Sequence, residues 1–228
     1  QPLTIGYAPT SGIIYPASDR PEDIEAARKK YFSMPEDDSN WTWNVAWWSD
    51  PVLLGKYPEE GLKKYEKYLP KITEEDMRLI SEPIDVYGQN IYNGRAFRMG
   101  ADGNPEEVGR VPGAGKTAVN WPVTPECLYW GPKFLYERYK KPIYITENGM
   151  ACHDIVSLDQ RVHDPNRIDF LARYLHELKR AAEEIDLRGY FQWSLMDNFE
   201  WEKGYAERFG IVYVDFETQE RILKDSAY

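Results

Sequence analysis

Four short runs of β-branched and aromatic residues, each next to a glycine or a proline, recur along the chain. Runs of this kind are typical of buried strands, and they predict strands at residues 3–8, 84–92, 142–147 and 189–195. Stretches of helical character lie between them. Because strands that alternate with helices form parallel sheets covered by helices, the pattern predicts an α/β fold.

Three helices are expected, at residues 21–34, at residues 124–140 and directly after Asp164. The first opens on Pro21 and two acidic residues, which suit the first turn of a helix. The third has Asp164 as its N-cap and a proline at its first helical position. Its aliphatic residues recur at alternating offsets of 3 and 4 and predict one buried stripe, formed by Ile168, Leu171, Leu175, Leu178 and Ala182.

Polar and acidic side chains lie where the last three predicted strands end. In parallel α/β folds chemistry gathers at the C-terminal ends of the strands, so these side chains are candidates for a site. They are Gln89, Asn90, Tyr92, Thr146, Glu147, Asn148, Trp193, Asp197 and Asn198. The stretches 33–70, with four tryptophans, and 94–116, rich in glycine, are expected to be loops on the same face. Four strand–helix units amount to half of an eight-unit barrel.

Composition narrows the possible partners. With 28 Lys and Arg against 38 Asp and Glu, the formal charge is −10, which argues against nucleic acid and anionic membranes. No run of about 18 apolar residues predicts a membrane span. The length fits one large domain or two small ones, and we treat residues 1–228 as a single unit. Two cysteines without a CxxC pair or a histidine cluster predict reduced thiols, no metal site and a cytoplasmic location.

Aromatic residues are abundant, with 8 Trp, 17 Tyr and 8 Phe. Two interpretations stay open: a tyrosine-rich core and surface, or a site that stacks flat ligand faces such as those of sugar rings. Glu147 is similarly ambiguous. A hydrophobic strand delivers this carboxylate to its C-terminal end, where it pairs either with an arginine of a neighbouring strand or with donors of a ligand. Gly113 to Thr117 lacks the glycine spacing of a phosphate loop and is expected to be a surface loop.

The last sixty residues resolve part of this ambiguity. Residues 191–201 (FQWSLMDNFEW), continuing through 204–205, 208–210 and 214–215, resemble the C-terminal signature of glycoside hydrolase family 1, the β-glucosidase family. The segment 146–149 (TENG) resembles the nucleophile motif of that family. Residues 83–92 resemble its sixth strand, and residues 21–27 the helix after its fifth. The resemblance covers essentially the whole chain and implies the C-terminal half, strands 5–8, of a (β/α)8 TIM barrel.

The resemblance assigns roles residue by residue. Glu147 is the expected nucleophile, Tyr92 holds its carboxylate by a hydrogen bond, and Asn90 belongs to the same polar cluster. The family has no metal or organic cofactor in this reaction, so none is expected here.

The expected sugar-binding residues come from the same motifs. Trp193 stacks under the non-reducing sugar, and Glu200 and Trp201 grip its outer hydroxyls. Phe209 helps to wall that pocket, and Trp121 is the platform for the leaving group.

One family feature is missing. The acid/base glutamate of the family follows an Asn and precedes a Pro, whereas the only Glu-Pro here, at Glu82, follows Ser81 and precedes a strand. The resemblance therefore implies a retaining β-glycoside hydrolase whose acid lies in a missing or separate N-terminal half. That half-barrel polypeptide is the expected partner, with self-association as the lesser option. The alternative is an inactive half barrel that serves as a folding or assembly unit or a weak sugar-binding module.

Overall fold

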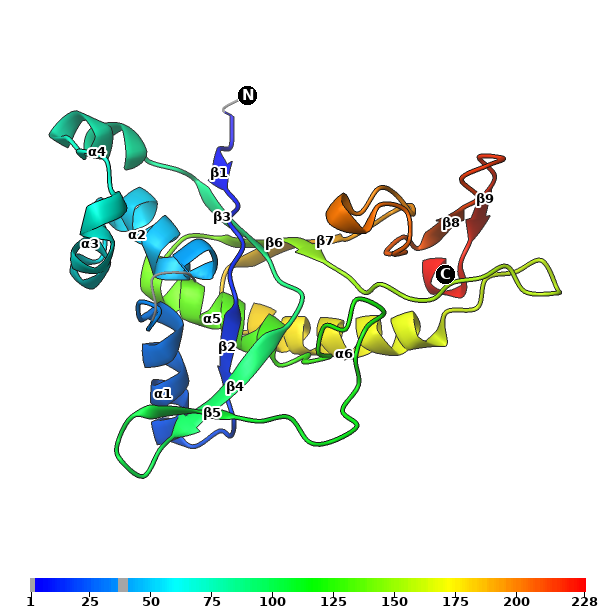
Figure 1. The fold of residues 1–228 in the computed structure, drawn as a ribbon, viewed down its shortest axis with the longest axis horizontal. Helices are drawn as coiled ribbons and strands as arrows, with labels where there is room; N and C mark the ends of the chain where they lie inside the picture. Colours follow the sequence, from blue (N-terminus) through cyan, green and yellow to red (C-terminus); the bar gives the residue numbers. More distant parts are fainter. Residues whose placement is uncertain (1–2, 37–40) are drawn as a thin grey trace.

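The computed structural model describes residues 3–36 and 41–228. At its centre is a parallel sheet whose strands follow chain order and stay open at both edges (Figure 1). Its members are β1 (Gly6–Tyr7), β3 (Val86–Asn90), β6 (Ile143–Asn148) and β7 (Leu187–Gln192). This arrangement confirms the predicted α/β fold and the half barrel. The first strand is shorter than predicted, because beyond Tyr7 its pairing with β3 continues only as an isolated bridge at Thr10.

Three helices confirm the predicted ones with slightly different ends: α1 (Pro21–Phe32), α5 (Cys127–Tyr139) and α6 (Pro165–Ala182). Figure 1 shows α5 and α6 along one side of the sheet. Their apolar faces meet Tyr87 and Ile145 of the sheet, and these residues belong to one continuous core. The core sits between the sheet and the helix layer, and it fixes where the ends of the strands point.

The buried face of α6 differs from the predicted stripe. Ile168 and Leu175 are 44% and 40% exposed. The buried residues of the helix are Arg167, Phe170, Tyr174, Leu178 and Ala181. The rings of Phe170 and Tyr174 stack with centroids 3.8 Å apart, so two aromatic residues line the core together with Leu178 and Ala181. A stripe drawn through aliphatic residues alone therefore misplaces the face.

The stretch 33–70 is not a loop, although residues 37–40 of it lie outside the described residues. The chain forms η1 (Trp41–Trp43), α2 (Val45–Leu54), α3 (Glu59–Tyr65) and η2 (Glu66–Tyr68), and α4 (Glu74–Ile80) follows. The Asn44 side chain caps α2 by accepting a hydrogen bond from the Trp47 amide at 2.8 Å. Trp47 then packs with Tyr65 and Met34 in a small second core. Tertiary packing of these aromatics stabilises helices whose sequence carries a weak periodic pattern.

The glycine-rich stretch 94–116 is also more ordered than predicted. It contains β4 (Gly94–Met99) and β5 (Pro105–Val108), an antiparallel pair that joins β2 (Ile13–Pro16) in a three-stranded sheet. Phe97 is buried on the side of α1, whereas Arg98 pairs with Glu106 across the two strands at 2.9 Å. The glycines of this stretch suggest a loop, although β4 carries both buried and exposed residues, as a strand with one covered face does.

The chain ends in a small unit that the hydrophobic pattern did not predict. It consists of η3 (Trp201–Lys203), the antiparallel pair β8 (Val212–Val214) and β9 (Arg221–Leu223), and η4 (Asp225–Ala227). Figure 1 shows β8 and β9 beyond the C-terminal ends of β6 and β7. Across residues 3–36 and 41–228, no helix is both long and apolar enough to span a membrane.

The two edges of the central sheet are the open sides of the fold. β1 and β7 each have one neighbouring strand among the described residues. Near the β7 edge large apolar side chains are exposed, with Phe191 at 57% and Leu195 at 63%. Unpaired strand edges and exposed apolar area favour association with further strands.

We therefore expect this chain alone, at micromolar concentration, to sediment as oligomers or to melt without cooperativity. Addition of the complementary N-terminal half of the barrel is expected to give a single species that contains one copy of each half. Analytical ultracentrifugation with and without that half checks this. A monomer with a cooperative melt that the second half leaves unchanged would contradict the expectation.

Candidate active site

A cleft of about 720 Å³ opens at the C-terminal ends of the strands. Its lining contains all eight site residues expected from the sequence: Asn90, Tyr92, Trp121, Glu147, Trp193, Glu200, Trp201 and Phe209. They come from β3, β6, the end of β7 and the segments that follow these strands. The fold thus brings together residues that are more than one hundred positions apart in the chain.

Glu147 lies near the end of β6, in register with Asn90 of β3. The Tyr92 hydroxyl donates a hydrogen bond to Glu147 Oε2 at 2.8 Å. Burial, together with Glu147, raises the pKa of Tyr92, so this hydroxyl stays protonated and remains a donor. Asn90 Oδ1 accepts from Thr146 Oγ1 at 2.7 Å and so lies beside the carboxylate rather than on it. No arginine in the described part of the chain forms an ion pair with Glu147.

Asn148 and Gly149 position the end of β6. The buried Asn148 side chain donates to the Ile91 carbonyl at 2.8 Å, and its Oδ1 accepts from the Tyr190 hydroxyl at 2.9 Å. It thereby bonds β6 to the strands on both sides. A Cβ atom at Gly149 would lie 1.7 Å from the Trp193 carbonyl oxygen. The glycine is required because the β7 backbone approaches it closely, and not for the tight turn that an Asn-Gly pair suggests.

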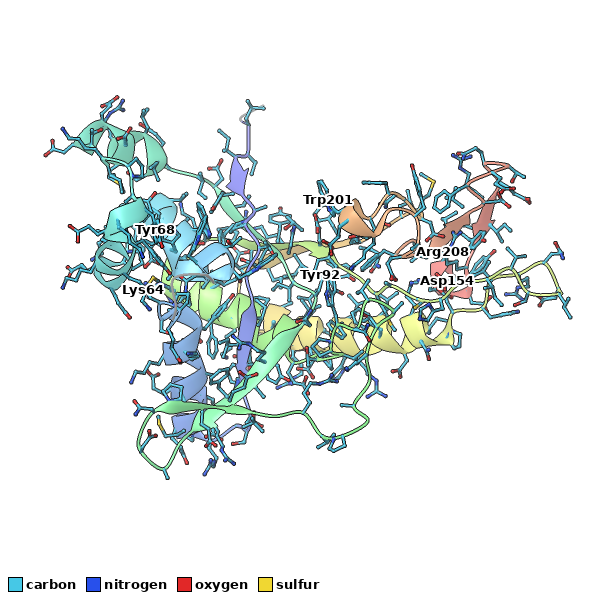
Figure 2. All side chains as sticks on the ribbon, viewed as in Figure 1. Lys64, Tyr68, Tyr92, Asp154, Trp201 and Arg208 are labelled. Carbon is cyan, nitrogen blue, oxygen red and sulfur yellow. The ribbon has the colours of Figure 1, made fainter. Side chains whose placement is uncertain are left out.

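Trp193 and Glu200 face each other across the segment after β7. The Trp193 indole N–H donates to Glu200 Oε2 at 3.3 Å. Burial raises the pKa of Glu200, and the charges of Glu147 and Glu207 add to this, while the indole bond opposes it. Trp201, next in the chain and labelled in Figure 2, is 78% exposed and lines the cleft. The charge of Glu147 therefore acts on Glu200 across the cleft.

Three aromatic rings form one wall of the cleft. The centroid of Tyr92 lies 5.1 Å from that of Trp121 and 6.2 Å from that of Phe209, and Trp121 and Phe209 are 6.0 Å apart. Phe209 is 2% exposed and supports the wall from behind, whereas Trp121 is 37% exposed. At this position the aromatic residues form a surface on which a flat ligand face can stack.

Behind the cleft, six charged side chains form what we call the ion cluster: the cations Arg167, Arg208 and Lys224 and the carboxylates Asp154, Asp164 and Asp197. Arg167 and Lys224 are fully buried. Lys224 Nζ lies 2.6 Å from Asp154 and 2.7 Å from Asp197. Each buried charge has an opposite partner, which is the condition for burying it.

The ion cluster joins the segments that follow β6 and β7. The Arg167 guanidinium donates to the Met150 carbonyl at 3.2 Å and to the Arg208 carbonyl at 2.9 Å. Asp197 Oδ1 accepts from the Gly210 amide at 3.0 Å. Figure 2 labels two members, Asp154 and Arg208, beside the C-terminal strands. The ion cluster thus holds the segment that follows β6 against the segment that follows β7.

The structure adds residues that sequence reasoning missed. They line the same cleft and are Thr10, Ser11, Gly12, Trp43, Asn93, Val119, Glu202 and Lys203. Of these, only Trp43 had been noted in the sequence, as one of four tryptophans in the stretch 33–70. The others are common residue types that the fold brings to the cleft.

Within the described ranges, no group of three or more His, Cys, Asp and Glu side chains is arranged to hold a metal ion. Glu82 follows α4 and pairs with Arg78 at 3.2 Å. It precedes β3 and therefore lies at the opposite end of the sheet from the cleft.

The raised pKa of Glu200 gives a site-specific prediction. Protonation of Glu200 removes the charged acceptor of the Trp193 N–H, so the indole resonance should titrate with a midpoint above 4.5, the ordinary value for Glu. Glu147→Gln removes a neighbouring negative charge and should lower this midpoint. A ¹H–¹⁵N NMR titration of the chain assembled with its complementary half checks both. A midpoint at or below 4.5, or no effect of Glu147→Gln, would contradict the electrostatic coupling.

The ion cluster gives a second prediction. Lys224→Met leaves Asp154 and Asp197 partly uncompensated in the interior, and we expect a loss of about 3–5 kcal/mol in the free energy of unfolding. The matched control is Arg173→Met, since the Arg173–Asp169 pair is exposed, at 62% on each side, and its loss should have a much smaller effect on the free energy of unfolding. Urea denaturation of the assembled protein measures both. Equal losses in the free energy of unfolding would show that the ion cluster stabilises the fold no more than an exposed ion pair does.

Comparison with known proteins places this geometry in a family. The model of Glycosyl hydrolase family 1 matches residues 1–228. Beta-glucosidase A of Thermotoga maritima is 44% identical over an alignment of 228 positions, which covers 98% of this chain and 49% of that protein. The 1,4-beta-D-glucan glucohydrolase of Thermotoga neapolitana is 42% identical, with the same coverage of 98% and 49%.

Solved structures agree. The beta-glucosidase from Thermotoga maritima in complex with glucoimidazole matches with a TM-score of 0.79 and 43% identity over 99% of this chain and 49% of that chain. The chain spans about half the length of the relatives it matches and corresponds to the C-terminal half of their TIM barrel. The matched region contains the whole cleft wall formed by β3, β6 and β7. This chain belongs to glycosyl hydrolase family 1.

Proposed function

We propose that this chain supplies the nucleophile and the sugar-binding wall of a retaining β-glucosidase, whose acid/base carboxyl comes from the N-terminal half of the barrel. The observation that carries the proposal is the Glu147 carboxylate at the end of β6, held by the Tyr92 hydroxyl at 2.8 Å inside the cleft. The names of the relatives, beta-glucosidases and 1,4-beta-D-glucan glucohydrolases, support β-glucosides as substrates.

The reaction proceeds by double displacement. Glu147 attacks the anomeric carbon, and the bond to the leaving oxygen breaks as the acid of the other half protonates that oxygen. A glycosyl ester to Glu147 results. The acid/base carboxyl of the other half, now deprotonated, then takes a proton from water. The water oxygen attacks the anomeric carbon and displaces Glu147, with net retention of configuration. Tyr92 orients the carboxylate before attack and donates to the oxygen that becomes the carbonyl oxygen of the ester.

The sugar is held on the β7 side of the cleft. Trp193 presents its indole to the sugar ring, while Glu200 accepts charge-assisted hydrogen bonds from hydroxyl groups. Trp201 extends beside them, and Phe209 supports the pocket from behind. Trp121 packs beside Tyr92, which follows β3, and is assigned as the surface on which the leaving group rests.

The half coverage favours a second candidate, an inactive half barrel that acts as an assembly unit or a weak sugar-binding module. The two candidates differ in one assay. If the enzyme proposal is correct, hydrolysis of an aryl β-glucoside is absent for this chain alone and appears on mixing with the complementary half. If no activity appears in the mixture while glucose-like inhibitors still bind, the second candidate is correct.

Glu147→Gln tests the nucleophile. An amide cannot form the glycosyl ester, so kcat of the assembled enzyme should fall by roughly 10⁴–10⁶-fold, as when other enzymes lose a covalent nucleophile. The matched control is Glu82→Gln, which changes the one Glu-Pro glutamate and should leave kcat unchanged because Glu82 lies at the far end of the sheet. Mass spectrometry after treatment with a 2-fluoro glycoside should locate the label on Glu147. A label on another carboxylate would refute the assignment.

A further inference from the structure

The cleft has an exposed indole at the end opposite Glu200, and the function proposed above gives it no role. We infer that this residue, Trp43, forms a distal subsite that stacks against a later ring of a β-linked gluco-oligosaccharide, beyond the ring that rests on Trp121. This inference depends on the proposed function and specifies its substrate class.

Trp43 belongs to the wall of the cleft that lies next to β1. It lines the cleft together with Thr10, Ser11 and Gly12, the residues that follow β1. The Gly12 amide donates to the Trp43 carbonyl at 3.3 Å, which ties η1 to this strand end. The Trp43 side chain is 57% exposed, whereas its neighbour Trp47 is buried in the small second core.

The order of the sheet places Trp43 on the leaving-group side. Trp193 follows β7 at one edge, and Gly12 and Trp43 adjoin β1 at the other, three strand spacings or about 14 Å away. Glu147 lies between them on β6. A sugar bound at Trp193 reaches Glu147 from the β7 side, so a long leaving group extends past Trp121 toward Trp43.

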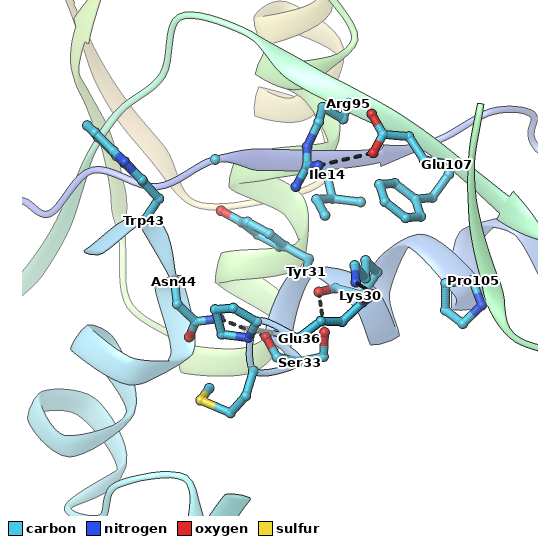
Figure 3. Close-up of a pocket in the computed structure, with 14 residues that line it drawn as sticks. Ile14, Lys30, Tyr31, Ser33, Glu36, Trp43, Asn44, Arg95, Pro105 and Glu107 are labelled. Atoms are coloured by element: carbon cyan, nitrogen blue, oxygen red, sulfur yellow. Dashed lines mark hydrogen bonds and ion pairs between the residues drawn. The ribbon is translucent and has the colours of Figure 1, made fainter. Parts of the chain in front are cut away.

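A second cavity of about 650 Å³ continues beyond this point and shares Gly12 and Trp43 with the cleft. Figure 3 shows the indole of Trp43 pointing away from the other labelled residues of that cavity, so its ring belongs to the cleft. The charged groups of the second cavity are paired: Arg95 with Glu107 at 3.0 Å and Lys30 with Glu36 at 3.1 Å.

These ion pairs bear on the charge of the ligand that the second cavity favours. Because the cations and carboxylates of the second cavity neutralise each other, the path beyond the cleft favours a neutral ligand over an anionic or cationic one. An exposed indole offers a flat face to the C–H side of a pyranose ring. A neutral oligosaccharide chain meets both conditions.

The test uses this chain assembled with its complementary half. We compare kcat/KM for cellotriose with kcat/KM for an aryl β-glucoside, whose leaving group is too short to extend past Trp121. Trp43→Ala is expected to lower the ratio of the two values by about 10-fold, which corresponds to about 1.4 kcal/mol. Trp43→Phe should recover part of the ratio because it keeps an aromatic face.

The matched control is Trp41→Ala. Trp41 lies on the same helical turn and is 40% exposed, but its ring packs on Trp48 at 5.4 Å and does not line the cleft. This variant should leave the ratio unchanged. An unchanged ratio in Trp43→Ala, or an equal fall for both substrates, would overturn the inference. So would the loss of assembly in sedimentation, because Trp43 would then belong to the contact between the halves.

A separate readout distinguishes failure of the inference from failure of the proposed function. If the wild-type assembly does not hydrolyse the aryl β-glucoside, the proposed function fails. The affinity of the assembly for cellotetraose, measured by calorimetry, then tests the role of Trp43 independently of hydrolysis. Weaker binding by Trp43→Ala than by Trp41→Ala supports the distal subsite, and equal binding by the two variants overturns it.

Discussion

The ion cluster behind the cleft is the interaction on which the arrangement of the site depends. Arg167 and Lys224 are fully buried and are neutralised by carboxylates from segments that follow β6 and β7 and from the start of α6. Because an unpaired buried charge is costly, these segments have one favourable arrangement relative to each other. The same side chains also bond the Met150 and Arg208 carbonyls, so the arrangement extends to the backbone on both sides of the cleft. Residues as distant in the chain as Glu147 and Glu200 are therefore held facing one cavity.

Within that cavity, the electrostatics disfavour an anionic ligand and favour one that donates many hydrogen bonds. Glu147 and Glu200 both face the cleft, and the charge of Glu147 contributes to the raised pKa of Glu200. Their direct partners in the cleft are neutral donors, the Tyr92 hydroxyl and the Trp193 indole. Sugar hydroxyls are suited to such acceptors, and the rings of Trp121 and Trp193 supply flat apolar surfaces beside them. This combination explains why carboxylates and aromatic residues are concentrated at one end of the sheet.

The open sheet sets the second constraint. A barrel strand normally bonds to a neighbour on each side, and here β1 and β7 each have one neighbour within the described residues. Phe191 and Leu195 remain exposed beside the β7 edge. A stable site therefore requires strands that cover these edges. In the proposed enzyme, the same strands deliver the acid/base group that the cleft wall of this chain lacks.

The sequence by itself indicated the parallel strands through their hydrophobic runs, and its resemblance to the family supplied the strand order and eight of the residues that line the cleft, because runs and compact motifs are local features of the chain. Only the tertiary structure decided which side of α6 is buried, since Arg167 is stable in the interior only beside Asp154 and Asp164 from a preceding segment. It also decided that the stretch 33–70 forms helices around Trp47, and that Phe97 and Arg98 belong to a strand of a second sheet. Most of the partners of these residues belong to other elements or loops, and a contact between two elements leaves no periodic signal in either of them. For the same reason only the tertiary structure places Trp43 in the cleft, through the contact of η1 with Gly12.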